Sequence, residues 1–256
     1  MEVYLVGAGV ILIYFFLLFL IAQKIDDNSI VDIGWGAGFV LTTLITLLVF
    51  GAFSVSTVII ALLVSIWGVR LAYHIGKRNI GKPEDPRYVE MRKKWGKDHY
   101  YLKAYFNVFF AQGFFMFVVV SPALAAIASP QNQLGIVAFL GIAVWIVGFL
   151  FEAVGDYQLK QFLSVKENRG TLMTTGLRKY TRHPNYFGES MMRWGIFIVS
   201  FGTTGNFLTV ISPVTITYLL VFVSGVPLLE KSHRRKEGYE EYARKTNTFI
   251  PWFPKK

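Results

Sequence analysis

The fold is decided by long apolar stretches, the first of which is Val3–Ala22, VYLVGAGVILIYFFLLFLIA. About 20 predominantly apolar residues are needed for a helix to cross the hydrocarbon core of a bilayer, and this segment has that length without a charged side chain. Similar stretches recur along the chain at Ile33–Phe53, Val55–Val69, Ala104–Ala128, Leu134–Phe151, Pro184–Phe201 and Phe207–Val226. The sequence therefore predicts an all-α, polytopic integral membrane protein with seven transmembrane helices.

The composition agrees with this class and excludes several kinds of site. Of the 256 residues, 54% are hydrophobic and 16% are charged, whereas a soluble domain carries about a quarter charged residues. The chain has no cysteine, which excludes disulfides, iron–sulfur clusters, cysteine-ligated zinc and cysteine nucleophiles. The four histidines are scattered along the sequence, so no metal site is predicted. Neither a glycine-rich dinucleotide fingerprint nor a P-loop is present, which excludes Rossmann and Walker sites.

The distribution of basic residues predicts the topology. Of the 26 lysines and arginines, 23 lie in three segments, at 76–103, 156–184 and beyond 226. Seven spans with the N-terminus outside and the C-terminus inside place all three segments in the cytoplasm, as the positive-inside rule requires. The net charge of +10 then reflects topology and an attraction to membrane lipids or an anionic ligand, and no nucleic-acid partner is predicted.

We accordingly predict one membrane domain over residues 1–256, whose parts differ in their relation to the bilayer. In residues 76–103, Tyr88, Met91, Trp95, His99 and Leu102 recur at helical spacing, which predicts an interfacial amphipathic helix. The tail is expected to pack on the bundle, either closing a pocket or lying at the interface. In chain order the parts are three spans (1–75), a cytoplasmic loop (76–103), four spans (104–226) and a cytoplasmic tail (227–256).

Ionisable residues near the inner ends of two spans are the candidates for chemistry, because charges inside a membrane are costly. Glu152, Asp156 and Lys160 share one face of the fifth span. Asn185, Glu189 and Arg193 share one face of the sixth. Interhelical salt bridges are the structural alternative. Pro184 suits a first helical turn, where free N–H groups beside Arg182 and His183 favour phosphate. Because the nearby carboxylates can accept hydrogen bonds from ribose hydroxyls, a nucleotide fits better than a simple anion.

The stretch 176–195, GLRKYTRHPNYFGESMMRWG, resembles the C-terminal signature of the steroid 5-alpha-reductase-like family. Asp156, the run Asn168–Gly170 and the closing Phe249–Pro254 also resemble that family, and the match is closest to its bacterial branch. The resemblance implies a seven-helix membrane reductase that binds NADPH in the cytoplasmic half of the bundle. It would reduce the carbon–carbon double bond of a lipid-like α,β-unsaturated carbonyl compound, in the bacterial inner membrane and without a metal.

The resemblance also implies roles for individual residues. The family places a catalytic Glu in the second span and a catalytic Tyr in the third, and the nearest residues here are Asp32 and Tyr73. A bulky replacement of Gly188 is expected to obstruct the cofactor. The candidate cofactor-binding residues are Arg70, Arg78, Asn79, Glu152, Asp156, Lys160, Arg169, Arg178, Arg182, His183, Asn185, Tyr186, Glu189, Arg193, Trp194, Tyr239 and Tyr242.

Two other functions stay open. Membrane methyltransferases that use S-adenosylmethionine share the Arg-His-Pro-Asn-Tyr motif and a tail like that of Glu230, Tyr239 and Tyr242. Their tails usually carry adjacent acidic residues, whereas Glu230 stands alone here, and Asp156 with the Asn-Tyr-Phe-Gly-Glu run favours the reductase. A non-enzymatic lipid-binding protein is the third alternative. The sequence does not identify the substrate.

Overall fold

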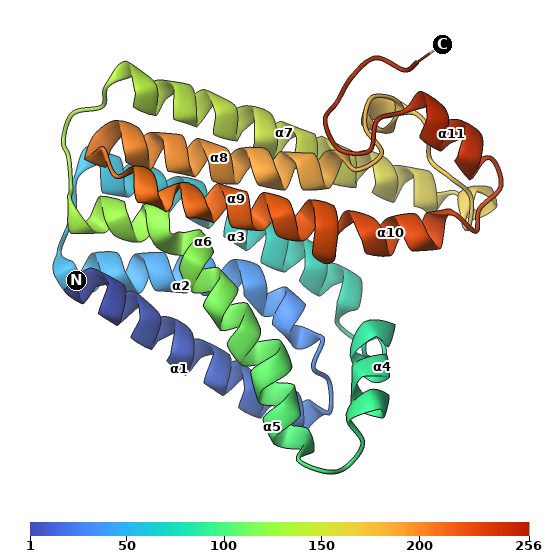
Figure 1. Ribbon diagram of the computed structural model, residues 1–256, viewed down its shortest axis with the longest axis horizontal. Coiled ribbons are helices and arrows are strands. Elements are labelled where there is room, and N and C mark those ends of the chain that lie inside the picture. Colours follow the sequence, from blue (N-terminus) through green and yellow to red (C-terminus); the bar gives the residue numbers. More distant parts are fainter. Residues whose placement is uncertain (256) are drawn as a thin grey trace. The chain divides into compact units, whose positions relative to one another are not determined.

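The computed structural model describes residues 1–255, which are helical and contain no strand. These residues form two compact units (Figure 1). The first unit comprises Met1–Gly135 with Ser200–Thr209, and the second comprises Ile136–Val199 with the chain from Val210 onward. Each unit is described separately below.

The first unit is built from long helices whose ends are set by local signals. Ser54 accepts a hydrogen bond from the backbone N–H of Thr57 in a capping box, which begins α3. Gly51, with φ +56°, ends α2. The helices are α1 (Glu2–Ile25), α2 (Ile30–Phe50), α3 (Val55–Asn79), α4 (Pro86–Trp95), α5 (Tyr100–Ala104) and α6 (Ala111–Ala128), with a π-helical segment, Tyr105–Phe110, before α6.

Helices α2 and α3 approach each other at backbone distance. A Cβ added at Gly36 would lie 2.4 Å from the carbonyl oxygen of Gly68, and one added at Gly68 would lie 2.6 Å from that of Gly36. Since carbon and oxygen atoms cannot approach so closely, only glycine fits at either position. The reciprocal contact fixes the position of α3 against α2.

The second unit has an antiparallel helix pair at its centre. Its helices are α7 (Ile136–Ser164), α8 (Pro184–Thr204), α9 (Ile211–Tyr218), α10 (Val226–His233) and α11 (Tyr239–Lys245). Between them lie 3-10 turns at Lys166–Asn168 and Gly176–Lys179 and a π-helical segment at Leu219–Val223. The 3-10 turn Phe207–Val210, which joins α8 to α9, belongs to the first unit up to Thr209, as do the last residues of α8. Figure 1 shows α7 and α8 side by side.

Glycines seven residues apart bring α7 and α8 together. A Cβ at Gly148 would lie 2.6 Å from the carbonyl oxygen of Gly188, and a Cβ at Gly188 would lie 2.4 Å from that of Gly148. The same reciprocal relation joins Gly141 and Gly195, whereas Gly155 faces Pro184. Residue 188 therefore contacts the neighbouring helix directly, so a bulky side chain there would separate α7 from α8 whether or not a cofactor is bound.

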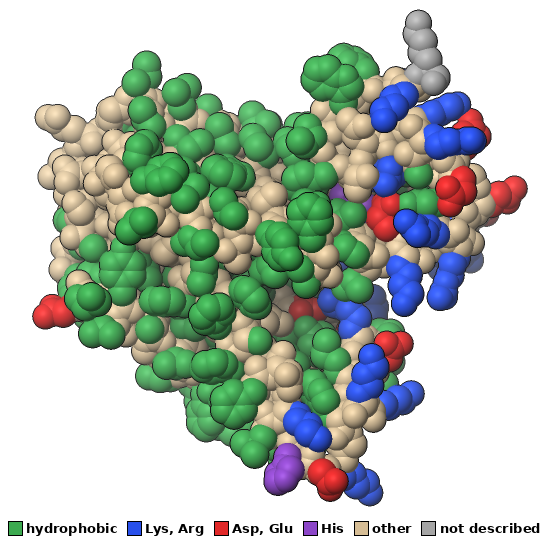
Figure 2. All heavy atoms as spheres, viewed as in Figure 1, with side chains coloured by type: hydrophobic (Ala, Val, Ile, Leu, Met, Phe, Trp, Pro, Cys, Tyr) green, Lys and Arg blue, Asp and Glu red, His purple; other side chains and the backbone are tan. Residues whose placement is uncertain are grey.

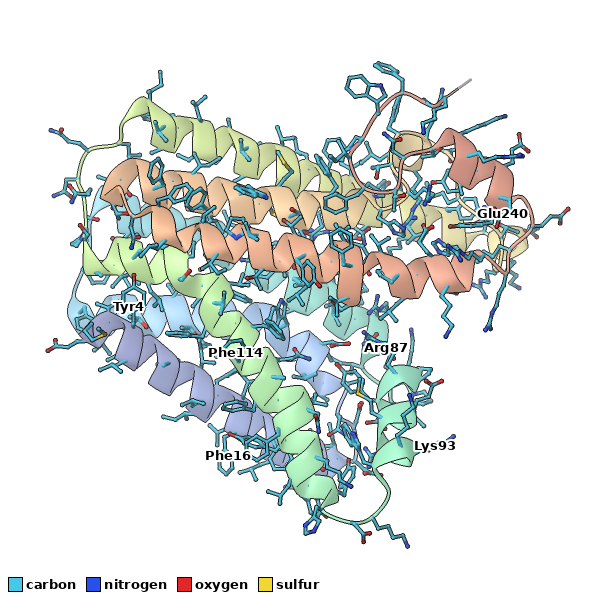
Figure 3. All side chains as sticks on the ribbon, viewed as in Figure 1. Tyr4, Phe16, Arg87, Lys93, Phe114 and Glu240 are labelled. Carbon is cyan, nitrogen blue, oxygen red and sulfur yellow. The ribbon has the colours of Figure 1, made fainter. Side chains whose placement is uncertain are left out.

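The structure contains several helices that fit an integral membrane protein. Within residues 1–255, six helical segments are long and apolar enough to cross a membrane: Glu2–Ile25, Ile30–Phe50, Val55–Asn79, Tyr100–Ala128, Ile136–Ser164 and Phe207–His233. Each contains one of the predicted spans or most of it. The sixth predicted span corresponds to α8, which has 21 residues but carries Asn185, Glu189 and Arg193 and is not among the six. Large apolar side chains remain exposed along these helices, as at Phe16 and Phe114 (Figures 2 and 3).

The segment after α3 differs from the predicted single amphipathic helix. Helix α4 ends at Trp95, because Gly96 has φ +63°, and His99 with φ +53° precedes a separate helix, α5. Backbone conformations with positive φ cannot continue an α-helix. His99 and Leu102 therefore do not share a continuous helical face with Tyr88, whose side chain is buried inside the first unit.

Candidate functional site

The polar centre of the second unit is the carboxylate of Glu230 on α10. Arg182 donates to both of its oxygens, from Nε at 3.0 Å and from Nη2 at 2.9 Å. His183 Nε2 lies 2.7 Å from Oε1, and the hydroxyl of Tyr239 donates to Oε2. Glu230 is 8% exposed, so this carboxylate is buried with two side chains that precede α8 and one that begins α11.

Every N–H donor of the Arg182 guanidinium is used within the protein. Besides its bonds to Glu230, Nη1 donates to the carbonyl oxygens of Thr246 (2.7 Å) and Ala243 (3.1 Å), and Nη2 donates to Thr248 Oγ1 (2.8 Å). A guanidinium has five N–H groups, and all five are accounted for. Arg182, which the sequence suggests as a phosphate ligand, therefore connects the start of α8 to the tail in this structure.

His183 is fully buried and has one nitrogen available. Its ring stacks on Tyr186 and on His233, with centroids 5.7 Å and 6.2 Å apart. Burial lowers the pKa of His183, and the charges of Arg178 and Arg182 lower it further, outweighing the effect of Glu230. The imidazole is therefore neutral at pH 7, and Nε2 carries the proton that it donates to the carboxylate. This leaves Nδ1 as an acceptor, and Nδ1 has no hydrogen-bond partner within residues 1–255.

Arg178 and Lys236 bring positive charge to the same end of the unit. Arg178 is 6% exposed, donates from Nη1 to the carbonyl oxygen of Arg182 at 2.7 Å, and has a buried Nε without a partner in the described chain. Burial lowers the pKa of Arg178, while Asp156 and two tyrosines oppose this shift. Burial and the charge of Arg178 also lower the pKa of Lys236. Lys236 donates to the carbonyl oxygen of Thr171 at 2.9 Å, which leaves two of its ammonium N–H groups for other acceptors.

Part of the polar set expected on α7 and α8 is buried in the helix pair. Arg193 is 2% exposed and lies in electrostatic range of Glu189 and Glu152, of which Glu152 is 3% exposed. Asn185, at the start of α8, has a buried Oδ1 that lacks a partner among residues 1–255. The arrangement places a charged cluster inside the pair and an amide oxygen at its end.

Other predicted residues of the second unit lie toward its surface or have packing roles. Lys160 and Arg169 are exposed, and the ring of Trp194 packs edge-to-face on Phe197 with centroids 6.0 Å apart. Tyr242 is buried and donates to the carbonyl oxygen of Arg178 at 2.6 Å. Figure 2 shows charged side chains gathered over α10 and α11, whereas hydrophobic side chains cover the long helices.

In the first unit, Asp32 is bound to α4. Its two oxygens accept hydrogen bonds from Tyr88 Oη and from Arg87 Nη2, each at 2.7 Å, and Figure 3 labels Arg87 on α4. Tyr73 is 67% exposed on α3, where Lys77 Nζ lies 3.3 Å from its hydroxyl. Catalytic roles for Asp32 and Tyr73 stay predictions.

The cofactor-binding candidates of the third span, Arg70, Arg78 and Asn79, lie in the C-terminal half of α3. Arg70 is half-buried, and Arg78 donates to the side-chain oxygen of Asn79 at 3.0 Å. Asn79 lines a shallow pocket together with Ser29, Lys82 and Asp85. Their contacts with a cofactor stay predictions.

The chain resembles known proteins over most of its length. A family model described as "Protein of unknown function (DUF1295)" matches residues 18–246. An uncharacterized protein of Schizosaccharomyces pombe is 24% identical over 216 residues, covering 75% of this chain and 62% of the yeast protein. The chain thus spans less than two thirds of the length of that relative. No solved structure matches the chain.

Proposed function

Because the chain belongs to the DUF1295 family, which is associated with steroid 5-alpha-reductase-like proteins, we propose that it is an NADPH-dependent membrane reductase. Its substrate is a lipid-like α,β-unsaturated carbonyl compound, and the reaction reduces the carbon–carbon double bond. In this proposal α8 also crosses the membrane, as the sixth of seven spans, the N-terminus is outside, and the cofactor site faces the cytoplasm of a bacterial cell.

The observation that carries the proposal is the mixture of cations and acceptors in the second unit. Arg178 is in electrostatic range of Asp156, and Lys236 is in range of Arg178. The buried Nε of Arg178, Oδ1 of Asn185 and Nδ1 of His183 add one donor and two acceptors without partners in residues 1–255. A dinucleotide phosphate needs both kinds of group, because its phosphates accept hydrogen bonds and its ribose hydroxyls and carboxamide donate them.

These residues would divide the binding of NADPH between them. Arg178 and Lys236 would hold phosphate oxygens, while Asp156 and Asn185 would accept hydrogen bonds from hydroxyl or amide groups. When bound, NADPH supplies the hydride that the reduction requires. The glycine contacts between α7 and α8 keep Asn185 close to the α7 backbone, since a Cβ at Gly155 would lie 3.6 Å from the backbone nitrogen of Asn185.

The substrate side of the proposal needs a donor that polarises the carbonyl oxygen as negative charge develops on it. Asp32 and Tyr73 are the candidates from the family resemblance, and of these the Tyr73 hydroxyl can donate, whereas both oxygens of Asp32 accept hydrogen bonds in this structure. Tyr88, whose hydroxyl donates to Asp32, is a further candidate at the same place. Activity assays on Asp32→Asn and Tyr73→Phe would identify which of them acts.

The direct test is a cofactor titration with the purified protein in lipid nanodiscs. NADPH is expected to bind with saturation, and both Asp156→Ala and Asn185→Ala are expected to weaken binding about tenfold or more, since each removes a hydrogen bond to a buried ligand group. Gln161→Ala, at an exposed position of α7, is the matched control and should bind as the unmodified protein does. Saturable binding of S-adenosylmethionine with no binding of nicotinamide cofactors would reject the reductase.

A methyltransferase is the second candidate because of one specific assembly. The Glu230 carboxylate is hydrogen-bonded to Arg182, His183 and Tyr239, and these residues carry the resemblance to the enzymes that use S-adenosylmethionine. The same titration separates the two proposals, because each predicts binding of a different cofactor.

A further inference from the structure

The loop that follows α11 exposes large apolar side chains although its backbone is held in place. In this tail loop, residues 246–255, Ile250 is 65% exposed, Trp252 is 67% exposed and Phe253 is 74% exposed. The backbone N–H of Trp252 donates to the carbonyl oxygen of Tyr180 at 3.0 Å, and Thr181 Oγ1 donates to that of Phe249 at 2.8 Å. The exposure is therefore a property of a folded loop.

The attachment of the loop gives its height relative to the bilayer. The tail loop is bonded to the segment 177–181, and the N–H of Leu177 in that segment donates to Gln158 Oε1 of α7 at 2.9 Å. Helix α7 has 29 residues, whereas about 20 residues cross the hydrocarbon core. Counted from Ile136, the helix leaves the core near Gly155. Gln158 lies about one turn further on, so the segment that it holds is at the lipid–water boundary.

The charges beside the loop match an anionic surface. Lys179, Arg244 and Lys255 are exposed around it, and no acidic residue occurs in residues 246–255. Tryptophan and other aromatic side chains favour the headgroup region, and lysine and arginine near the cytoplasmic surface are attracted to anionic lipids. The aromatic and aliphatic groups of the loop thus lie beside basic groups of the loop itself, of the turn Gly176–Lys179 and of α11, all outside the spans.

We propose that the tail loop docks on the anionic inner surface of the membrane that the helices span. Ile250, Trp252 and Phe253 enter the headgroup region, while Lys179 and Lys255 contact phosphate groups of the lipids. Because the transmembrane helices already hold the loop at the surface, docking requires no further loss of translational freedom. This surface adjoins the proposed cofactor site, because Lys179 follows Arg178 in the sequence, but its function as an anchor does not depend on the reductase activity.

Because the chain has no cysteine, a single introduced cysteine can be spin-labelled without first removing native ones. We would label Trp252→Cys and, separately, Phe253→Cys in the full chain, reconstituted in nanodiscs of phosphatidylcholine and phosphatidylglycerol. The ratio of collision rates with oxygen and with a water-soluble nickel chelate reports depth in the membrane. Leu150→Cys on the exposed face of α7 is the lipid control, and Glu240→Cys on the outer side of α11 is the solvent control (Figure 3).

The expected result is an oxygen-to-nickel ratio at 252 and 253 that lies between the Leu150 and Glu240 values and well above the Glu240 value. The ratio should fall toward the Glu240 value when Lys255→Glu is added or phosphatidylglycerol is omitted. Ratios equal to that of Glu240 at both sites and in both lipid mixtures would overturn the proposal. Concentration-dependent spin–spin broadening at these sites would also overturn it, because a second copy would then cover the loop.

Discussion

The substitution Glu230→Gln tests the central polar assembly of the second unit. It keeps the size of the side chain and removes the negative charge that Arg182, His183 and Tyr239 share. It also places an amide N–H₂ opposite hydrogen-bond donors. Because Arg182 and Glu230 are each about 10% exposed at the side chain, water cannot replace the lost interactions.

The expected magnitude follows from the buried ion pair. Removing one partner of such a pair costs about 3–5 kcal/mol because the other charge stays buried. Arg182 keeps its bonds to Thr246, Ala243 and Thr248, so the lower end of that range applies. About 3 kcal/mol in a chain of this length corresponds to a lower melting temperature by about 6–12 °C.

The assay is thermal unfolding in detergent, followed by circular dichroism. Glu240→Gln removes an exposed carboxylate of α11 and should leave the transition within a degree or so of the unmodified protein. In the double variant Arg182→Met with Glu230→Gln, the second substitution should cost less than it does alone, since the two sites are coupled. A melting temperature for Glu230→Gln equal to that of the Glu240→Gln control would refute the assignment of Glu230 as the centre of the unit.

Three further predictions concern other parts of the molecule. Gly188→Leu should prevent the native α7–α8 contact and abolish monodisperse elution in size-exclusion chromatography, whereas Gly135→Leu, at a site with open space, should elute normally. Because burial lowers the pKa of His183 in the folded state, the unfolded chain binds more protons below about pH 6.5, so stability should fall by up to about 1.4 kcal/mol per pH unit as pH decreases from there. His183→Gln should reduce this dependence in pH-scanned melting curves, leaving the part contributed by His233, whose pKa burial lowers to about 4, and the exposed His99→Gln should not change it. Asp32→Asn should release α4 and speed proteolytic cleavage between α3 and α5, and an unchanged cleavage rate would show that the contact is dispensable.

Hydropathy was sufficient to locate six of the predicted spans. Their apolar residues face lipid as well as protein, so length and composition alone identify them. Hydropathy located α8 less well, because Glu189 and Arg193 lower the mean hydropathy of that helix. In the fold these two side chains are placed against α7. The break after Trp95 depends on positive φ at Gly96 and His99, and helical periodicity does not report backbone conformation.

The site was predictable in its residue types and not in its pairings. Arg182 and His183 were recognisable from their motif, but Glu230 lies 47 and 48 positions away, and no local pattern indicates that it binds both. Lys236 was missed because it stands in a generally basic tail, and its proximity to Arg178 arises only when α10 is packed. Interactions between distant segments are set by tertiary packing, on which a single sequence gives no direct information.

The bonding of Arg182 and His183 also explains why one motif can occur in two enzyme classes with different cofactors. The guanidinium of Arg182 is saturated by Glu230 and the tail, and His183 shares the same carboxylate. In this chain the shared part of the motif therefore builds the junction between α8 and the tail. For the two proposed functions, the choice between NADPH and S-adenosylmethionine therefore rests on residues outside that junction. In the proposed NADPH site those residues are Asp156 and Asn185, together with the charges of Arg178 and Lys236.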